Sequence, residues 1–422
     1  MWIFARIASA QTLPQPDQAG FEHVVVVMME NRSFDHFFGW LPGANGQQAG
    51  LTYRESNGTA HLTHALPPDY QGCGFLDPGH SYTDGRVQYD NGACDGFLFD
   101  GSDSSTANSN QANDVYAIGY YGQSDLPFLG AAGPAFTVLD NYFCGIMAET
   151  YPNRFHMHAA QTDRLTNTMT TSTLPTIWDR LQANGVSGRY YFSDLPFLAL
   201  WGTKYANISK PFNQFLADAA AGTLPNVAFV DPGFAGETTD TSNDDHPHGD
   251  IRDGEAFLNQ IYNAVTSSPN WSKTVLIINF DEWGGFFDHV PPPLAPVPPA
   301  SAAAGIPDGR LGFRVPCLVI SPYARRNYIG HEQFDHTSIL KMIEWRFGLP
   351  PLTVRDQTAN NLADVLNFAA PDISAPTFNV PTGPFGTPCN PVAISSTATA
   401  TRAPALQELR VKAVKSGFHG VR

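Results

Sequence analysis

The stretch TVLIINFDE occupies residues 274–282 and contains the clearest buried strand in the chain. Its side chains are apolar on both faces, which is typical of a strand in a parallel sheet that helices cover on each side. Two carboxylates, Asp281 and Glu282, follow the apolar run directly. Because ligands bind at the carboxyl ends of strands in such sheets, the stretch predicts a central strand and the place of a functional site.

Short apolar runs and amphipathic segments alternate on both sides of this stretch. The predicted strands lie at 23–29, 136–140, 189–192, 226–230 and 315–322. The predicted helices lie at 152–160, 173–185, 211–222, 253–268 and 336–348. This alternation predicts an α/β fold in which helices sandwich a mostly parallel central sheet. Residues 40–135 are rich in Gly, Asn, Asp, Ser and Gln and predict an elaborate loop region rather than a separate domain.

The composition is that of a large enzyme domain with many loops. The chain has 422 residues, of which 42% are hydrophobic and 15% charged, and it contains 37 Gly and 34 Pro. Long loops are where enzymes place binding groups. The net charge of −15 argues against a nucleic-acid partner, because phosphate backbones repel an acidic protein. Carboxylates gathered in one place can still hold a cation, which then attracts a phosphate.

Polar residues follow two of the predicted strands directly. Glu30 and Asn31 come after the strand at 23–29, and Asp281 and Glu282 come after the strand at 274–280. Each pair alone is compatible with loop solvation or a helix cap. Two such pairs at strand ends of one sheet favour a site for a hard cation with oxygen ligands.

A hydroxyl precedes the helix that begins near Pro152. Thr150 stands just before Tyr151-Pro152-Asn153-Arg154. Such a hydroxyl can cap the helix. It can also act as a nucleophile beside a cation, with the helix N-terminus holding phosphate oxygens. Sequence spacing leaves both interpretations open.

Three loop histidines are candidates for proton transfer or phosphate binding. His80 lies in DPGHSYTD, His246 in NDDHPHGD, and His289 follows GGFFD. A loop histidine is often merely solvated, but a histidine can protonate a leaving oxygen near neutral pH. The mixed Asp and His content of NDDHPHGD also allows that loop to bind a metal by itself.

Five segments taken together resemble a known family. They are ENRSFDHFFG (30–39), TYPNR (150–154), NDDHP (243–247), DEWGGFFDHVPPP (281–293) and RLGFRVPCLVISPYAR (310–325). In this order they are similar to the non-specific phospholipases C of bacteria and plants and to the related acid phosphatases. This phosphoesterase family is akin to alkaline phosphatases, so the resemblance implies an alkaline phosphatase-like fold with long active-site loops.

The resemblance also implies roles for individual residues. Glu30, Asn31, Asp281 and Glu282 would bind one divalent metal ion, which could be Ca, Mg, Mn or Zn. Thr150 would contact the same metal and act as the nucleophile.

The remaining candidates surround the substrate phosphate. His80 and His246 match histidines that line the phosphate site in the family. His289 matches a family motif in which it either takes part in catalysis or only braces its loop. Arg154 would orient the loop or contact phosphate.

The expected activity is a metal-dependent, phospholipase C-like hydrolysis of phosphodiester bonds through a phospho-threonine intermediate. The substrate would be a phospholipid, cleaved to diacylglycerol and a phosphorylated head group, or a small phosphate ester. One alternative is an acid phosphatase acting on soluble phosphomonoesters, and another is a non-catalytic binding protein. A transient contact with a membrane surface is also considered. The candidates for a lipid-facing rim are Phe37, Phe38, Trp40, Phe286 and Phe287, although several of them are expected in the core, as aromatic residues usually are.

The resemblance and the composition divide the chain into three parts. Residues 1–20 are interpreted as an N-terminal segment that includes a signal-peptide remnant, because Ala8-Ser9-Ala10 resembles a signal peptidase site. Residues 21–390 form the predicted phosphoesterase catalytic domain. Residues 391–422 form a C-terminal tail that is predicted to be disordered or loosely docked.

The cellular location and the cysteines are connected. We expect a secreted or periplasmic protein, in which disulfides can form. Cys73 and Cys94 flank one loop-rich stretch and either form a disulfide or remain buried thiols.

Overall fold

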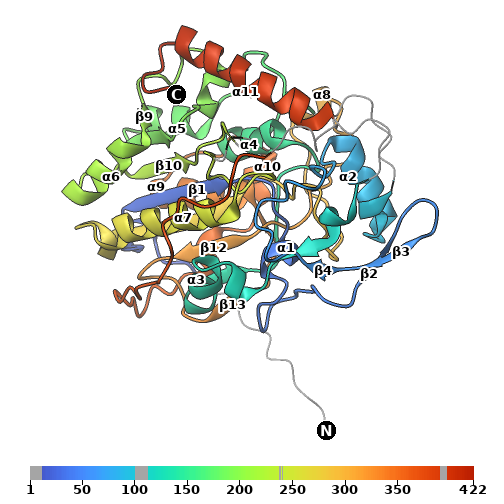
Figure 1. Cartoon of the computed structure of the whole chain (residues 1–422). Helices are drawn as coiled ribbons and strands as arrows, with labels where there is room; N and C mark the ends of the chain where they lie inside the picture. Colours follow the sequence, from blue (N-terminus) through green and yellow to red (C-terminus); the bar gives the residue numbers. More distant parts are fainter. Residues whose placement is uncertain (1–11, 100–112, 237–238, 240, 390–396) are drawn as a thin grey trace.

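A central β-sheet organises the protein (Figure 1). The computed structural model describes residues 12–99, 113–236, 239, 241–389 and 397–422. Within these residues the largest sheet has eight strands. In order across the sheet they are β13 (Tyr328–Gly330), β6 (Thr137–Leu139), β12 (Cys317–Ile320), β11 (Thr274–Phe280), β1 (His23–Met29), β10 (Val227–Asp231), β8 (Gly188–Phe192) and β9 (Ser209–Pro211).

The middle of the sheet is parallel, as the apolar runs predict. Strand β1 lies between β10 and β11, and Val26 pairs with Phe229 on one side and Ile277 on the other. All seven residues of β1 and all seven of β11 are buried, because helices cover both faces. Strand β12 runs antiparallel to both of its neighbours, so the sheet is mostly but not entirely parallel.

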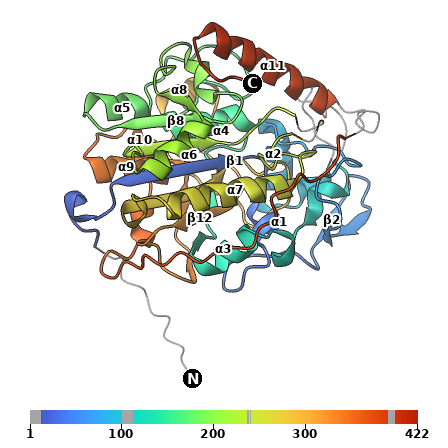
Figure 2. The same cartoon turned by 60° about the vertical axis from the view of Figure 1, so that its left-hand side comes forward.

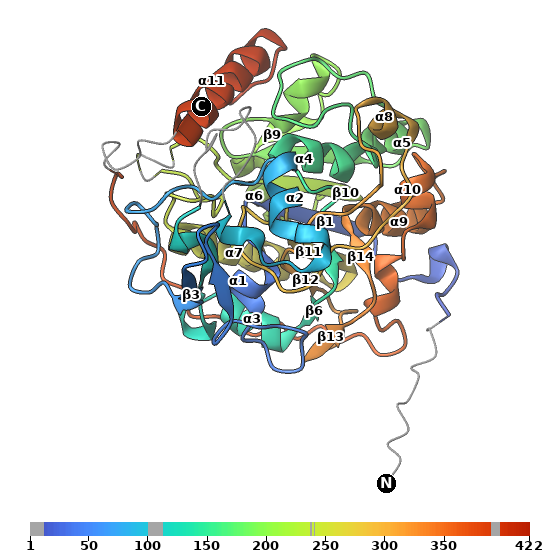
Figure 3. The same ribbon diagram turned by 90° about the vertical axis from the view of Figure 1, so that its right-hand side faces the viewer.

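Helices cover the two faces of the sheet. Figures 1 and 3 show α6 (Phe212–Ala221) and α7 (Ile251–Thr266) on one face. The opposite face carries α4 (Thr150–Ala159), α5 (Ile177–Ala183) and α9 (His336–Phe347). This arrangement confirms the predicted α/β sandwich.

The segment that follows β1 and the long loops contain only short elements. They are α1 (Phe34–Phe38), β2 (Thr52–Arg54), β3 (Ala60–Leu62), β4 (His64–Ala65), α2 (Tyr82–Tyr89), β5 (Gly119–Tyr120), α3 (Leu129–Ala135), β7 (Tyr142–Phe143), α8 (Pro299–Ala303), β14 (Phe334–Asp335) and α10 (Val354–Thr358). The described part of the loop region therefore packs onto the central sheet and builds no sheet of comparable size.

The disulfide partner of Cys73 differs from the expected one. Cys73 bonds to Cys389, with 5.3 Å between their Cα atoms, across 316 positions in the sequence. Cys94 is a buried free thiol, so the Cys73–Cys94 pairing is wrong. The side chain of Cys94 packs in the hydrophobic core, whereas Cys73 meets the chain segment that returns over the loops from the C-terminal side.

The described part of the C-terminal tail, residues 397–422, contains a docked helix, whereas the sequence predicted a disordered or loosely docked tail. Helix α11 (Thr397–Lys415) lies along the surface beside α4 and the 3-10 helix η6 (Phe197–Trp201) (Figures 1 and 2). Leu409, Ala413 and Phe418 are buried in the main hydrophobic core. These three side chains anchor the tail through apolar contacts.

The aromatic residues considered as a lipid-facing rim are mostly in the core. Phe37, Phe38, Phe286 and Phe287 are fully buried, and only Trp40 is partly exposed. These four residues therefore belong to the core, as the sequence led us to expect for several of them, and they are not available for a lipid-facing rim. Among the described residues no helix is both long and apolar enough to cross a membrane. The signal-peptide interpretation of residues 8–10 falls outside the described residues.

Candidate active site

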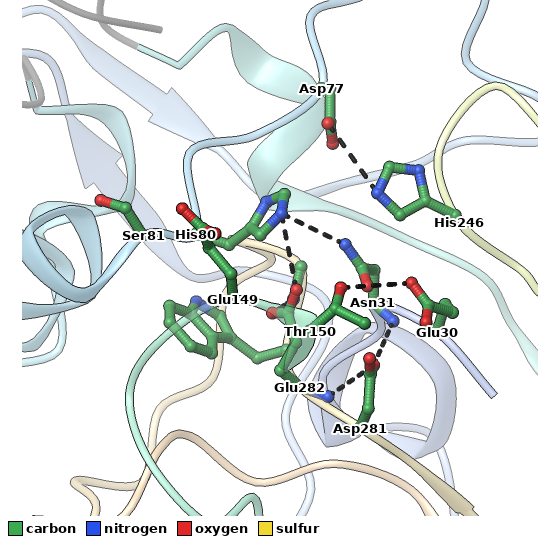
Figure 4. Close-up of polar contacts among 12 residues, drawn as sticks. Glu30, Asn31, Asp77, His80, Ser81, Glu149, Thr150, His246, Asp281 and Glu282 are labelled. Carbon is green, nitrogen blue, oxygen red and sulfur yellow. Dashed lines mark hydrogen bonds and ion pairs between the residues drawn. The ribbon is translucent and has the colours of Figure 1, made fainter. Parts of the chain in front are cut away.

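The two acidic pairs predicted from strand ends meet at one edge of the sheet. Glu30 and Asn31 follow β1, while Asp281 and Glu282 follow β11. The two strands are parallel neighbours, so their carboxyl ends lie side by side, and all four residues are fully buried. Figure 4 shows the four side chains around a common centre.

Backbone geometry fixes the orientation of these side chains. Asn31 has a positive φ of 56°, which turns the chain sharply after β1. Its backbone N–H donates to Asp281 Oδ1 over 3.2 Å, and the N–H of Glu282 donates to the same oxygen over 2.8 Å. The N–H of Gly284 donates to Glu282 Oε2 over 2.6 Å. One oxygen of each carboxylate is thus held by the backbone.

Thr150 begins α4 and points at this group. Its hydroxyl donates to Glu30 Oε2 over 3.4 Å (Figure 4). Glu149 occupies the N-cap position, and its side chain does not cap the helix. A hydroxyl at the first helical position, with the helix N-terminus beside it, combines a nucleophile with an anion-binding end.

Arg154 lies one helical turn after Thr150 and neutralises part of the negative charge. Its Nε and Nη2 atoms donate to Glu30 Oε1 over 3.1 and 2.8 Å, and its Nη1 donates to Asp231 Oδ1 over 3.0 Å. Burial alone would lower its pKa, but the neighbouring carboxylates of Asp231, Glu30 and Asp281 raise it. Arg154 therefore stays charged and orients Glu30. We call Glu30, Asn31, Thr150, Arg154, Asp281 and Glu282 the Thr150 cluster.

The Thr150 cluster has more negative charge than Arg154 can balance. Burial raises the pKa of Glu282 to about 8 and raises that of Asp281 well above its ordinary value, with the charge of Glu30 adding to both shifts. Asn31 Oδ1, Asp281 Oδ2 and Glu282 Oε1 are buried and accept no hydrogen bond from the described residues. Arg154 Nε lies 3.4 Å from Asp281 Oδ2 and His80 Nε2 lies 3.5 Å from Glu282 Oε1, so ion pairs offset part of the negative charge. Three inward oxygen atoms that accept no hydrogen bond still fit a hard divalent cation, which prefers oxygen ligands.

Two histidines stand beside the cluster, together with Asp77. The His80 ring lies 3.5 Å from Glu282 Oε1, and His246 Nε2 lies 3.9 Å from Asp77 Oδ2. Burial would lower the pKa of His80, but the charges of Glu282 and Asp77 raise it to about 9. Ligand atoms of Asp77, His80 and His246 lie within 4.8 Å of one another, which also permits a cation there. Both predicted histidines thus border the Thr150 cluster.

His289 makes its contacts in a different group. Its Nδ1 lies 2.5 Å from Asp35 Oδ2, and Arg314 binds both Asp35 and Asp288. We call Asp35, Asp288, His289 and Arg314 the Arg314 cluster. These contacts favour the interpretation that His289 braces its loop rather than serving the reaction.

The two histidines of the loop at 243–250 contact different groups. His246 turns toward Asp77, whereas His248 Nε2 lies 3.1 Å from the carbonyl oxygen of Phe75. Pro247 separates them, and His248 has a positive φ of 79°. The interpretation of this loop as a metal site by itself is therefore not supported.

Sequence reasoning missed two acidic residues of the site. Asp231 ends β10 and accepts hydrogen bonds from Arg154 and from the hydroxyl of Tyr190. The rule that found Glu30 and Asp281, a carboxylate at a strand end, would also have found Asp231. Asp77 lies in a loop, and the only sequence feature that points to a role in the site is its position three residues before His80.

A buried hydroxyl, carboxylates and histidines gathered at the carboxyl edge of an α/β sheet are compatible with the active site of an ester hydrolase. The profile of the Phosphoesterase family matches residues 21–350. The chain belongs to this family and is a hydrolase acting on ester bonds.

Curated relatives support the same assignment. Phospholipase C B of Mycobacterium tuberculosis is 34% identical over 457 residues, covering 91% of this chain and 85% of the relative. Non-specific phospholipase C1 of Arabidopsis thaliana is 31% identical over 394 residues, covering 82% of this chain and 71% of the relative. A solved protein of the alkaline phosphatase superfamily from Vibrio parahaemolyticus aligns with a TM-score of 0.41 at 10% identity, covering 83% of this chain and 73% of that one.

Proposed function

We propose that the protein is a metal-dependent phospholipase C-like phosphodiesterase that uses Thr150 as its nucleophile. The observation that carries this proposal is the contact between the Thr150 hydroxyl and Glu30 at the edge of a buried, oxygen-rich group. The names of the curated relatives support a phospholipid substrate. The donor set of the Thr150 cluster supports one divalent ion, and hard ions such as Ca, Mg or Mn suit it best, with Zn as the alternative.

The residues of the chain have separate tasks in this mechanism. Glu30, Asn31, Asp281 and Glu282 would hold the cation, whose charge would stabilise the ionised hydroxyl and the phosphate oxygens. Glu30 accepts the hydrogen bond of Thr150 and is the nearest base for its proton. Thr150 Oγ1 then attacks phosphorus, and the bond to the alcohol oxygen breaks.

The histidines complete the two steps. His246 protonates the leaving alcohol oxygen, and His80, which its acidic neighbours keep charged, binds a non-bridging phosphate oxygen. Water then attacks phosphorus and gives a proton to His246, the bond from phosphorus to Thr150 Oγ1 breaks, and Oγ1 takes its proton back from Glu30. Arg154 holds Glu30 in place through two hydrogen bonds.

The same reacting groups would serve an acid phosphatase, because only the pocket for the ester group differs between the two activities. Hydrolysis of soluble phosphomonoesters is therefore the second candidate function. A non-catalytic role is disfavoured because every reactive position holds a competent side chain.

We also propose that the protein works in a secreted or periplasmic environment. The Cys73–Cys389 disulfide supports this location, since disulfides persist in oxidising compartments.

The first test is the Thr150→Ala variant, with Thr150→Ser as its matched control. We expect wild type to hydrolyse p-nitrophenylphosphorylcholine and to lose activity with a chelator. Thr150→Ala should lose about 10³-fold or more in kcat, because no other hydroxyl replaces the nucleophile. Thr150→Ser keeps the hydroxyl and should retain substantial activity.

Three results would change the assignment. Turnover of p-nitrophenyl phosphate but not of the diester would favour the acid phosphatase. Full activity of Thr150→Ala would eliminate the covalent mechanism. A phosphoryl adduct found by mass spectrometry on a peptide without Thr150 would move the nucleophile elsewhere.

A further inference from the structure

A pocket joins the Thr150 cluster to the C-terminal helix. The pocket is open to solvent on one side, and most of its exposed lining is apolar. Glu30, Thr150 and Arg154 line one part of it, and Leu406 and Leu409 of α11 line another. A substrate bound at Thr150 therefore meets side chains that lie more than 250 positions later in the sequence.

The walls between these two parts are mainly aromatic. Tyr151, Phe197 and Phe234 line the pocket, and the rings of Tyr151 and Phe197 pack edge to face with centroids 5.6 Å apart. The guanidinium of Arg154 covers the Phe234 ring at 4.7 Å. Since Arg154 already donates to Glu30 and Asp231, its charge is balanced within the wall. The pocket thus offers an apolar surface beside a polar reaction centre.

Helix α11 is held firmly enough to form part of this surface. Leu409 is 2% exposed and Ala413 is fully buried. Lys412 Nζ donates to the carbonyl oxygen of Met169 over 2.9 Å and to Thr171 Oγ1 over 2.6 Å. Both acceptors lie in the loop that follows α4, so polar and apolar contacts fix the helix over the pocket.

We infer that Leu406 and Leu409 of α11 bind the hydrocarbon chains of the substrate alcohol and set the preference for lipid esters. This inference rests on the proposed function, which it makes more specific. In a phospholipid only the alcohol part carries long apolar chains, so an apolar wall next to the nucleophile selects that part. Each buried methylene strengthens binding roughly fourfold, whereas a small soluble ester gains nothing from this wall.

The experiment compares two substrates that differ only in chain length. Dibutyroyl- and diheptanoylphosphatidylcholine, both kept monomeric, have the same head group and the same leaving oxygen. Wild type should show a higher kcat/KM on the longer ester. Leu406→Gln should lower kcat/KM for the longer ester about tenfold and for the shorter one about twofold, because a polar side chain replaces the apolar wall.

A matched control lies on the same helix. Val411 is exposed and does not line the pocket, so Val411→Gln introduces the same polar group without touching the substrate. It should keep the wild-type ratio between the two esters. If melting shows that Leu406→Gln does not fold, Leu406→Ala takes its place with an expected loss of about fivefold on the longer ester.

The outcomes separate this inference from the function on which it rests. If wild type cleaves both esters but the folded Leu406 variant keeps the wild-type ratio, the inference is overturned and the proposed function stands. Equal changes in the Leu406 and Val411 variants would also overturn it. If wild type cleaves neither ester, both the inference and the phospholipase C-like function are overturned.

Discussion

The Thr150 cluster and the Arg314 cluster are both buried groups of acidic and basic side chains, but their hydrogen bonding differs. In the Arg314 cluster all four carboxylate oxygens of Asp35 and Asp288 accept at least one hydrogen bond, and the donors include Arg314 and His289. In the Thr150 cluster, Asp281 Oδ2 and Glu282 Oε1 accept none from the described residues.

This difference supports a structural role for the Arg314 cluster and the proposed reactive role of the Thr150 cluster. A buried carboxylate is tolerated when donors surround it, and it then ties loops together. A buried carboxylate without donors needs a cation or a proton. Arg314 supplies the cation in one cluster through direct hydrogen bonds. In the Thr150 cluster, Arg154 and His80 approach Asp281 Oδ2 and Glu282 Oε1 only to 3.4 and 3.5 Å, so the proposed mechanism assigns these oxygens to an added ion.

The largest expected effect comes from removing Asp281, a buried carboxylate with an oxygen that accepts no hydrogen bond from the described residues. Asp281→Asn should reduce activity by about 10³-fold and weaken metal binding, because one anionic ligand is lost. In the metal-free protein the same change should leave the melting temperature unchanged or raise it, since it relieves repulsion between Asp281, Glu30 and Glu282. Calorimetric metal titration and thermal unfolding with a chelator would measure both effects.

Asp308→Asn provides the control for Asp281→Asn. Asp308 pairs with Arg86 at the surface over 2.6 Å, away from the cluster. Its loss should not change metal affinity. A clear drop in the melting temperature of metal-free Asp281→Asn would mean that the cluster is structural, like the Arg314 cluster.

Removing the arginine of the Arg314 cluster should lower stability rather than activity, in contrast to Asp281→Asn. Arg314 donates from Nε to Asp288 Oδ1 over 2.9 Å and from Nη2 to Asp35 Oδ1 over 3.1 Å. Arg314→Met would leave two buried carboxylates without this donor and should lower the free energy of unfolding by about 3–5 kcal/mol. Denaturant unfolding would measure the loss.

The surface pair of Lys273 and Glu22 is the control for Arg314. These side chains are 51% and 48% exposed, so Lys273→Met should cost no more than about 1 kcal/mol. The kcat of folded Arg314→Met should stay close to wild type. A loss of kcat comparable to that of Thr150→Ala would place the Arg314 cluster in the reaction.

The sequence predicted those helices and strands whose buried positions follow from the pattern of neighbouring residues. Strand β11 and helix α7 follow from apolar runs and 3.6-residue periodicity, and the two acidic pairs follow from the strand ends. The family resemblance added the role of Thr150. Contacts between distant segments were not predictable: the pairing of Cys73 with Cys389 depends on how the chain returns over the loops.

The docking of helix α11 is another contact between distant segments that its own residues do not predict. Leu406, Leu409 and Ala413 are spaced as one helical face, but Pro404 and the preceding Thr-rich run favour no stable isolated helix. The helix gains its stability from docking beside η6, which only the fold reveals. The direction of β12 likewise depends on its neighbours in the sheet rather than on its own residues.

Glu255 differs from the carboxylates of both clusters, because among the described residues neither an arginine nor a candidate metal site balances its negative charge. Its Oε2 accepts from the backbone N–H groups of Phe128 and Leu129, yet burial raises the pKa of Glu255 from 4.5 to about 8. The folded protein therefore keeps a proton on Glu255 at pH values where the unfolded chain has lost it. Between pH 4.5 and 8 the unfolded state binds fewer protons, so stability should fall as pH rises through this window.

Glu255→Gln should remove that pH dependence, because the amide has no proton to lose and its oxygen accepts the same two hydrogen bonds. From pH 5 to pH 7 the free energy of unfolding of wild type should fall by about 1–2 kcal/mol more than that of the variant. Denaturant unfolding at the two pH values, with Glu408→Gln on the exposed face of α11 as control, would measure the difference. Parallel pH profiles for wild type and Glu255→Gln would mean that Glu255 is ionised in the folded protein. A cation or a donor would then have to balance it, as in the two clusters.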